Sequence, residues 1–234
     1  MLKIAVITPY YKESLHQLKK CHESVLAQGL EVTHFFISDG IPNPEIDLWN
    51  CVHIKLPMSL KDYGDTPRGI GAAIASAQQY DGICFLDADN WYEPNHIANI
   101  REVFSAYQTP IITISRNLYL KENGNYLGLC PECDGINFVD TSCYFFHKSA
   151  FNICRYWLFT PQGMGMLDDR IIWSAIQQQN ISRVHISQPT VNYATDFASH
   201  YHYFGLTPPP YSRVLNLRTM KSEPYVEFIK ENQL

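Results

Sequence analysis

Short apolar runs that alternate with amphipathic helical patterns limit the fold of this chain more than any other feature. Runs of strand length occupy residues 2–8, 32–37, 51–56, 82–86 and 111–115, and helical spacing of apolar residues occupies 14–28, 66–77 and 93–107. Strands of this length separated by helices are typical of an α/β sheet that is at least partly parallel. The first half therefore predicts strands that share one edge at their carboxyl ends.

The second half of the chain is less regular. Residues 117–135 are rich in Gly and Asn turn signals and are predicted to be loop. Residues 138–147 and 181–187 read as strands, and 168–179 as a helix. After Pro189 comes an aromatic tail interrupted by three consecutive prolines. No linker divides the chain, so we expect one domain over residues 1–190, with a tail at 191–234 packed on it.

Composition excludes several classes of protein. The 18 Lys+Arg against 23 Asp+Glu give a net charge of −5, and 46% of residues are hydrophobic. A disordered chain has fewer apolar residues, and a nucleic-acid partner calls for a basic excess. No run approaches the ~18 apolar residues of a membrane span. The N-terminus lacks the pattern of a secretion signal.

The seven cysteines favour a reducing compartment, and so a cytoplasmic protein; a peripheral membrane contact is left open. Cys130 and Cys133 have the spacing of half a zinc site. No second Cys pair follows them, so a turn with free thiols is favoured over structural zinc.

Carboxylates gather where strands end or helices begin. They are Asp39, Asp87, Asp89, Asp168 and Asp169. Ligands of open α/β sheets bind outside the carboxyl ends of the strands, where close acids need a cation or a donor-rich ligand. Asp87 and Asp89 are alternate residues of an extended segment, so both can face one ion. Such oxygen ligands suit Mg²⁺ or Mn²⁺ shared with a diphosphate. An ordinary Asx turn is the alternative.

The order of five motifs resembles the family 2 glycosyltransferases. The motifs are Ile-Ala-Val-Ile-Thr-Pro-Tyr-Tyr near the N-terminus, Ile37-Ser-Asp-Gly40, Arg68-Gly-Ile-Gly-Ala72, Phe85-Leu-Asp-Ala-Asp-Asn90 and Met166-Leu-Asp-Asp-Arg170. The resemblance covers roughly residues 2–185. It implies a GT-A fold, a Rossmann-like mixed and mainly parallel sheet flanked by helices. It also implies a nucleotide-binding half at about 1–116 and an acceptor half at about 117–190.

The resemblance also implies a nucleotide site. Thr8, Pro9 and Tyr10 would line the pocket for the base. Asp39 would accept a hydrogen bond from the uracil imide N–H, which favours a UDP-sugar donor. Arg68 would lie near the donor diphosphate, a group that suits a guanidinium fork.

The implied catalytic residue is Asp169, as general base, with Asp87 and Asp89 binding the metal. Adjacent helical residues point about 100° apart, so Asp168 would orient the base, cap the helix or meet the acceptor. Both acids could instead only favour the positive end of the helix. His200 could be a further metal ligand, although a packed or surface histidine is the commoner outcome for it and for His202.

The expected function is a metal-dependent transfer of a sugar from a UDP-sugar to an acceptor hydroxyl, with inversion implied by the resemblance. The acceptor would be a glycan, a lipid-linked molecule or a protein. One alternative is a sugar-phosphate nucleotidyltransferase, but the chain lacks a Gly-rich basic loop after its first strand. The other is a non-catalytic nucleotide-sugar or glycan-binding module, against which Asp89 and Asp169 argue.

Overall fold

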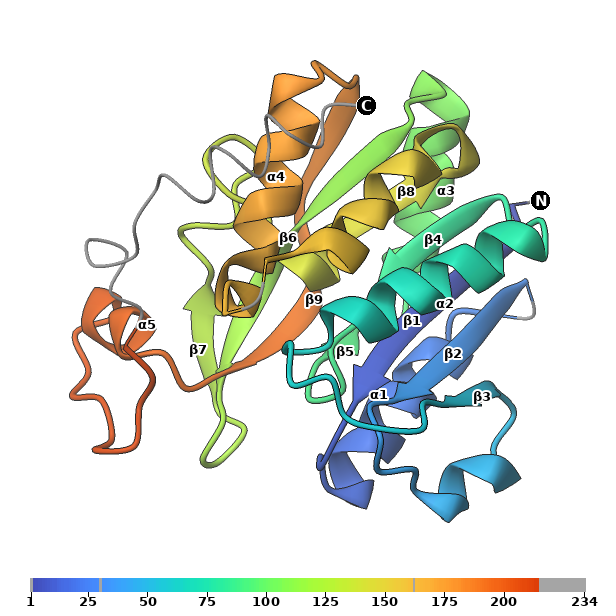
Figure 1. Ribbon diagram of the computed structural model, residues 1–234. Coiled ribbons are helices and arrows are strands. Elements are labelled where there is room, and N and C mark those ends of the chain that lie inside the picture. Colours follow the sequence, from blue (N-terminus) through green and yellow to red (C-terminus); the bar gives the residue numbers. More distant parts are fainter. Residues whose placement is uncertain (1, 30, 162, 215–234) are drawn as a thin grey trace.

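The centre of the fold is a twisted sheet of nine strands within the residues that the computed structural model describes, 2–29, 31–161 and 163–214. The strand order is β3-β2-β1-β4-β8-β6-β9-β5, with β7 paired to β6 (Figure 1). The strands are β1 (Ile4–Tyr10), β2 (Val32–Ser38), β3 (Val52–Lys55), β4 (Gly82–Phe85), β5 (Trp91–Tyr92), β6 (Ile111–Leu120), β7 (Tyr126–Leu129), β8 (Tyr144–His147) and β9 (Arg183–Thr195).

The longest ladders of the sheet are parallel. β1 pairs in parallel with β2 and β4, and β6 pairs in parallel with β9. β8 is antiparallel to both β4 and β6 and joins the two parallel parts. The expected mixed and mainly parallel sheet is therefore present.

Helices cover both faces of the sheet (Figure 1). They are α1 (Leu15–Leu26), α2 (Asp65–Ala77), α3 (His96–Tyr107), α4 (Asp168–Gln178) and α5 (Ala198–Tyr203), with 3-10 turns η1 (Pro44–Leu48), η2 (Thr141–Cys143), η3 (Lys148–Phe159) and η4 (Gly165–Leu167). Helices α2 and α4 pack with η3 on one face, and α1 and α3 lie on the other. A capping box of Ser14 and Gln17 begins α1.

Three sequence expectations about where elements begin or end need correction. β1 does not end before Pro9 but continues to Tyr10, because beyond Ile7 it pairs only with β2 and a missing N–H is tolerated there. α3 begins at His96 rather than Glu93, because β5 pairs with β9 just before it. The strand expected at 138–147 is shorter, since residues 141–143 form η2.

The largest differences lie in the second half. Residues 117–135 are not all loop, because β6 extends to Leu120 and pairs with β7. The last strand does not stop at residue 187. It shifts register around Pro189 and continues beside β6 to Thr195. The 12 residues of η3 were not expected from the sequence. Part of the expected tail, residues 215–234, lies outside the described residues.

Candidate active site

Two cavities adjoin each other at the carboxyl ends of β1, β2 and β4. The cavity beside β1, called here the β1 cavity, has a volume of about 510 Å³, and the α4 cavity beside helix α4 has about 410 Å³. Both are lined by Tyr63, Arg68, Asp87, Tyr193 and Arg213. A molecule in one cavity can therefore contact a molecule in the other.

The β1 cavity contains three of the four residues that the resemblance assigns to base recognition. Pro9 and Tyr10 reach it from the end of β1, and Asp39 follows β2. The Asp39 carboxylate accepts hydrogen bonds from the Leu60 N–H at 2.8 Å and the Ser59 hydroxyl at 2.9 Å. Its position is thereby held by the chain that forms the opposite wall.

Thr8 lies beneath this cavity rather than in its lining. It is fully buried, and its hydroxyl is 2.8 Å from His34 Nε2. Tyr10 is also anchored: its hydroxyl accepts from the Asn43 N–H at 2.9 Å and lies 2.7 Å from His53 Nε2. These contacts fix the end of β1, on which the cavity is built.

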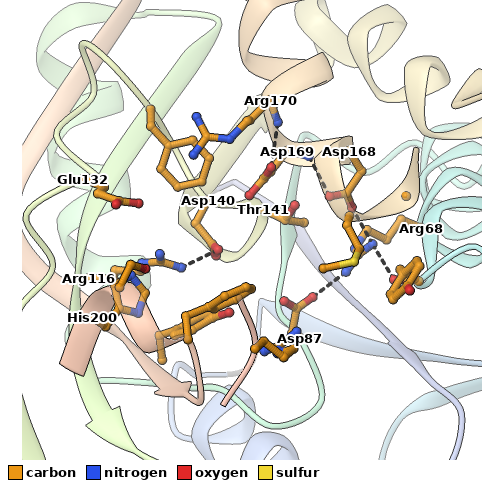
Figure 2. Close-up of a pocket in the computed structure, with 18 residues that line it drawn as sticks. Arg68, Asp87, Arg116, Glu132, Asp140, Thr141, Asp168, Asp169, Arg170 and His200 are labelled. Carbon is orange, nitrogen blue, oxygen red and sulfur yellow. Dashed lines mark hydrogen bonds and ion pairs between the residues drawn. The ribbon is translucent and has the colours of Figure 1, made fainter. Parts of the chain in front are cut away.

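Arg68 is surrounded by carboxylates instead of facing open space. Its Nη2 lies 2.6 Å from Asp87 Oδ1, and its Nη1 lies 3.0 Å from Asp168 Oδ2 (Figure 2). Its Nη1 also lies 3.5 Å from Asp65 Oδ1. Burial and the charge of Asp168 raise the pKa of Asp65, so Asp65 competes less for the charge of Arg68 than Asp87 and Asp168 do. Arg68 therefore holds Asp87 and Asp168 together.

Asp169 occupies the α4 cavity on the side away from Arg68 (Figure 2). One of its oxygens accepts from the Arg170 N–H at 2.7 Å. Burial, and then the charges of Asp168 and Asp140, raise the pKa of Asp169 well above its ordinary value. Asp140 is itself buried and paired with Arg116. Both adjacent acids line the α4 cavity, but Asp168 is paired with Arg68 and Asp169 is not.

Asp87 and Asp89 both reach the β1 cavity, as expected for a metal-binding pair. Each has one oxygen in a salt bridge, Asp87 Oδ1 with Arg68 at 2.6 Å and Asp89 Oδ2 with Lys121 at 2.8 Å. Burial raises the pKa of Asp89, against the opposing effect of Lys121. Across the described ranges, no three His, Cys, Asp or Glu side chains are grouped to hold an ion. The two carboxylates of Asp87 and Asp89 nevertheless fit a divalent ion that completes its coordination shell with phosphate oxygens.

His200 is buried in the lining of the α4 cavity. Its Nδ1 lies 2.6 Å from the Thr195 hydroxyl, and burial lowers its pKa to about 4. A neutral imidazole is the form that binds metal ions. His202 is exposed on α5. Cys130 and Cys133 are free and buried.

The cavities also contain charged residues that the sequence did not single out. They are Glu13, Lys61, Arg116, Lys121, Glu132, Asp140, Arg170 and Arg213. Lys121 comes from the segment 117–135 that was expected to be loop, Arg116 immediately precedes that segment, and Arg213 comes from the expected tail. Their charge was visible in the sequence, but their place was not, because it depends on the pairing of β6 with β9.

Structural comparison shows the same fold in TarS from S. aureus. The TarS 1-349 structure gives a TM-score of 0.66 at 13% identity, covering 87% of this chain and 63% of that one. The structure of TarS 1-349 with UDP gives a TM-score of 0.65 at 13% identity, covering 87% of this chain and 63% of that one. The complex of TarS 1-349 with UDP-GlcNAc gives a TM-score of 0.65 at 14% identity, covering 83% of this chain and 59% of that one. This chain thus spans about three fifths of those structures.

The shared architecture confirms the GT-A-like α/β fold expected from the sequence. No protein-family model and no curated protein matches the sequence. Among the described residues, none of the helices combines the length and apolar character needed to cross a bilayer.

Proposed function

We propose that this protein is a glycosyltransferase that moves a sugar from a UDP-sugar to an acceptor hydroxyl, with inversion at the anomeric carbon. The donor would bind in the β1 cavity, with the base beside Tyr10 and Asp39. The acceptor would bind in the α4 cavity, beside Asp169. The structures of TarS with UDP and with UDP-GlcNAc support a uridine donor for the fold that the two proteins share.

The observation that carries this proposal is the contact between the two cavities at Asp87 and Arg68. A sugar at this junction would have a nucleotide on one side and Asp169 on the other. Its anomeric carbon could then be attacked from the face opposite the leaving diphosphate. This arrangement favours direct displacement, in which the acceptor oxygen forms the new bond as the bond to the diphosphate breaks.

Asp169 would take the proton of the acceptor hydroxyl during this attack. Its raised pKa makes it a stronger base than an ordinary aspartate, provided that it has lost its proton. Asp168 and Arg68 would position the start of α4, and with it the base. General-base catalysis of this kind contributes about 10²–10⁴ in rate.

We further propose that Asp87 and Asp89 hold a Mn²⁺ or Mg²⁺ ion. His200 lines the α4 cavity and is not grouped with these two acids in the described residues, so it would join them as a ligand only after a rearrangement. Such an ion would offset the negative charge of the departing nucleoside diphosphate. The chain's own part is to present two carboxylates at the end of β4 in the wall of the β1 cavity.

The proposal predicts that Asp169→Asn removes transfer but leaves UDP binding intact. The amide cannot accept the proton, while the β1 cavity is unchanged because Asp169 does not line it. Sugar transfer would be followed with UDP-GlcNAc and other UDP-sugars, and UDP affinity by calorimetry. We expect at least a ~10²-fold loss of turnover at unchanged affinity. Turnover near that of the wild type would contradict the role of Asp169.

The same assay separates the alternatives. A nucleotidyltransferase would release diphosphate from a nucleoside triphosphate and a sugar phosphate. A binding module would bind UDP-sugar without transfer or hydrolysis. The cavity beside Asp169 favours the transferase, because a binding module gains nothing from a half-buried carboxylate of raised pKa in the wall of an adjoining cavity.

A further inference from the structure

Lys121, at the turn after β6, projects into the β1 cavity against Asp89. Its Nζ lies 2.8 Å from Asp89 Oδ2 and 3.7 Å from Asp196 Oδ2. Its backbone N–H donates to the Thr195 carbonyl at 3.0 Å, which fixes the position of the residue beside β9. The ammonium group therefore reaches the carboxylate that we assign to the metal.

The two acids beside Lys121 differ in how their charges are compensated. Asp196 forms a salt bridge with Arg213, whose guanidinium stacks on Phe197 at 4.1 Å from the ring centroid. For Asp89, Lys121 is the cationic side chain in salt-bridge contact within the part of the chain that the structure describes. Asp89 thus depends on Lys121 for its charge balance, whereas Asp196 does not.

A divalent ion and the Lys121 ammonium compete for the Asp89 carboxylate, because two cations that contact one carboxylate repel each other. The lysine stem is flexible and its side chain is 35% exposed, so the ammonium can move away. Within this cavity, a displaced ammonium can pair with the diphosphate of the donor, because that group is negatively charged.

We propose that Lys121 is a donor-binding residue with two partners: it neutralises Asp89 in the empty protein, and passes to the donor diphosphate when a divalent ion takes Asp89. This inference rests on the proposed function. It predicts that removing the ammonium has opposite effects on two ligands. The ion loses a competitor and binds more tightly, while the nucleotide loses a charge partner and binds more weakly.

The test is Lys121→Met, which keeps most of the apolar stem. Mn²⁺ binding without nucleotide would be measured by electron paramagnetic resonance, and UDP binding at saturating Mn²⁺ by calorimetry. We expect Mn²⁺ affinity to rise about fivefold, as for a lost ion pair, and UDP affinity to fall by a similar factor. Lys121→Arg keeps the charge and should leave UDP affinity close to that of the wild type.

Lys148→Met is the matched control. It removes a Lys–Asp pair of 2.9 Å with Asp81, which precedes β4 at the end of the strand away from the cavities. Neither affinity should change. A purely structural role of Lys121 would weaken both ligands in Lys121→Met, and that result, or two unchanged affinities, overturns the inference.

The wild type separates this inference from the proposed function. If it binds UDP but not Mn²⁺, the competition assigned to Lys121 is overturned while a UDP-dependent function stands. If it binds neither, both are overturned. If it binds both and Lys121→Met does not shift them in opposite directions, the role of Lys121 alone is overturned.

Discussion

The carboxylate of Asp169 acquires its basicity from its neighbours. Burial is the largest cause of its raised pKa, and the charges of Asp168 and Asp140 add to it. Asp168 is tied to Arg68 at 3.0 Å, so its charge is largely shared with that guanidinium. Asp140 lies on the opposite side of the cavity from Arg68 and adds negative charge that its pairing with Arg116 partly offsets (Figure 2). The proton affinity of the proposed base thus depends on its burial and on the charges of Asp168, Asp140, Arg170 and Arg116.

Asp140→Asn should move the acidic limb of the kcat/KM profile to lower pH. Asp140 disfavours the ionised form of Asp169, so removing its charge lowers the pKa at which the base becomes active. We expect a shift of about one pH unit, typical of a nearby charge. Glu102→Gln, which removes an exposed charge from α3, should leave the limb unmoved. An acidic limb of the kcat/KM profile that stays at the same pH, or moves to higher pH, in Asp140→Asn would contradict this account.

At the scale of elements, α2 lies close to the sheet because glycine is small. A Cβ added to Gly71 would lie 2.6 Å from Ile7 Cγ2, and one added to Gly69 would lie 2.5 Å from the Leu158 side chain. The helix therefore fits between β1 and η3 only without side chains at these positions. This close packing places Arg68, one residue earlier, between Asp87 and Asp168.

Gly71→Ala should destabilise the protein, although alanine is the better helix former. Overpacking against Ile7 costs about 1–3 kcal/mol, and the gain in helix propensity recovers about 1 kcal/mol of it. Urea unfolding measures the net loss. Ser76→Ala, on the exposed side of the same helix, should change stability by less than about 0.5 kcal/mol. Equal or higher stability of Gly71→Ala would show that α2 moves away from the sheet at no cost.

At the scale of the whole molecule, the sheet interleaves the two halves of the sequence. β8, from the second half, lies between β4 and β6 of the first, and β9 pairs along the length of β6. The two cavities likewise take residues from both halves. Stability and ligand binding should therefore be coupled across the molecule.

UDP should raise the melting temperature of the entire protein in a single cooperative transition. At a UDP concentration of 100 times Kd, the gain in unfolding free energy is about 2.7 kcal/mol. For a chain of this size, that corresponds to about 5–10 °C. Scanning calorimetry with and without UDP measures the shift. Two separate transitions, of which UDP moves one, would contradict the coupling.

The sequence alone determined the fold class, because local periodicity is enough to distinguish buried strands from amphipathic helices. It also located Asp39, Asp87, Asp89 and Asp169, since acids that follow parallel strands or begin a helix converge wherever the strands end. Each of these acids lines at least one of the two cavities, and Asp87 lines both.

Only the tertiary structure decided which neighbours these acids have. That Asp168 binds Arg68, that Asp140 lies near Asp169 and that Lys121 reaches Asp89 follow from contacts between residues far apart in the chain. The strand extensions along β6 and β9 have the same origin. Their polar segments are stabilised by each other's backbone hydrogen bonds, which no local pattern reveals.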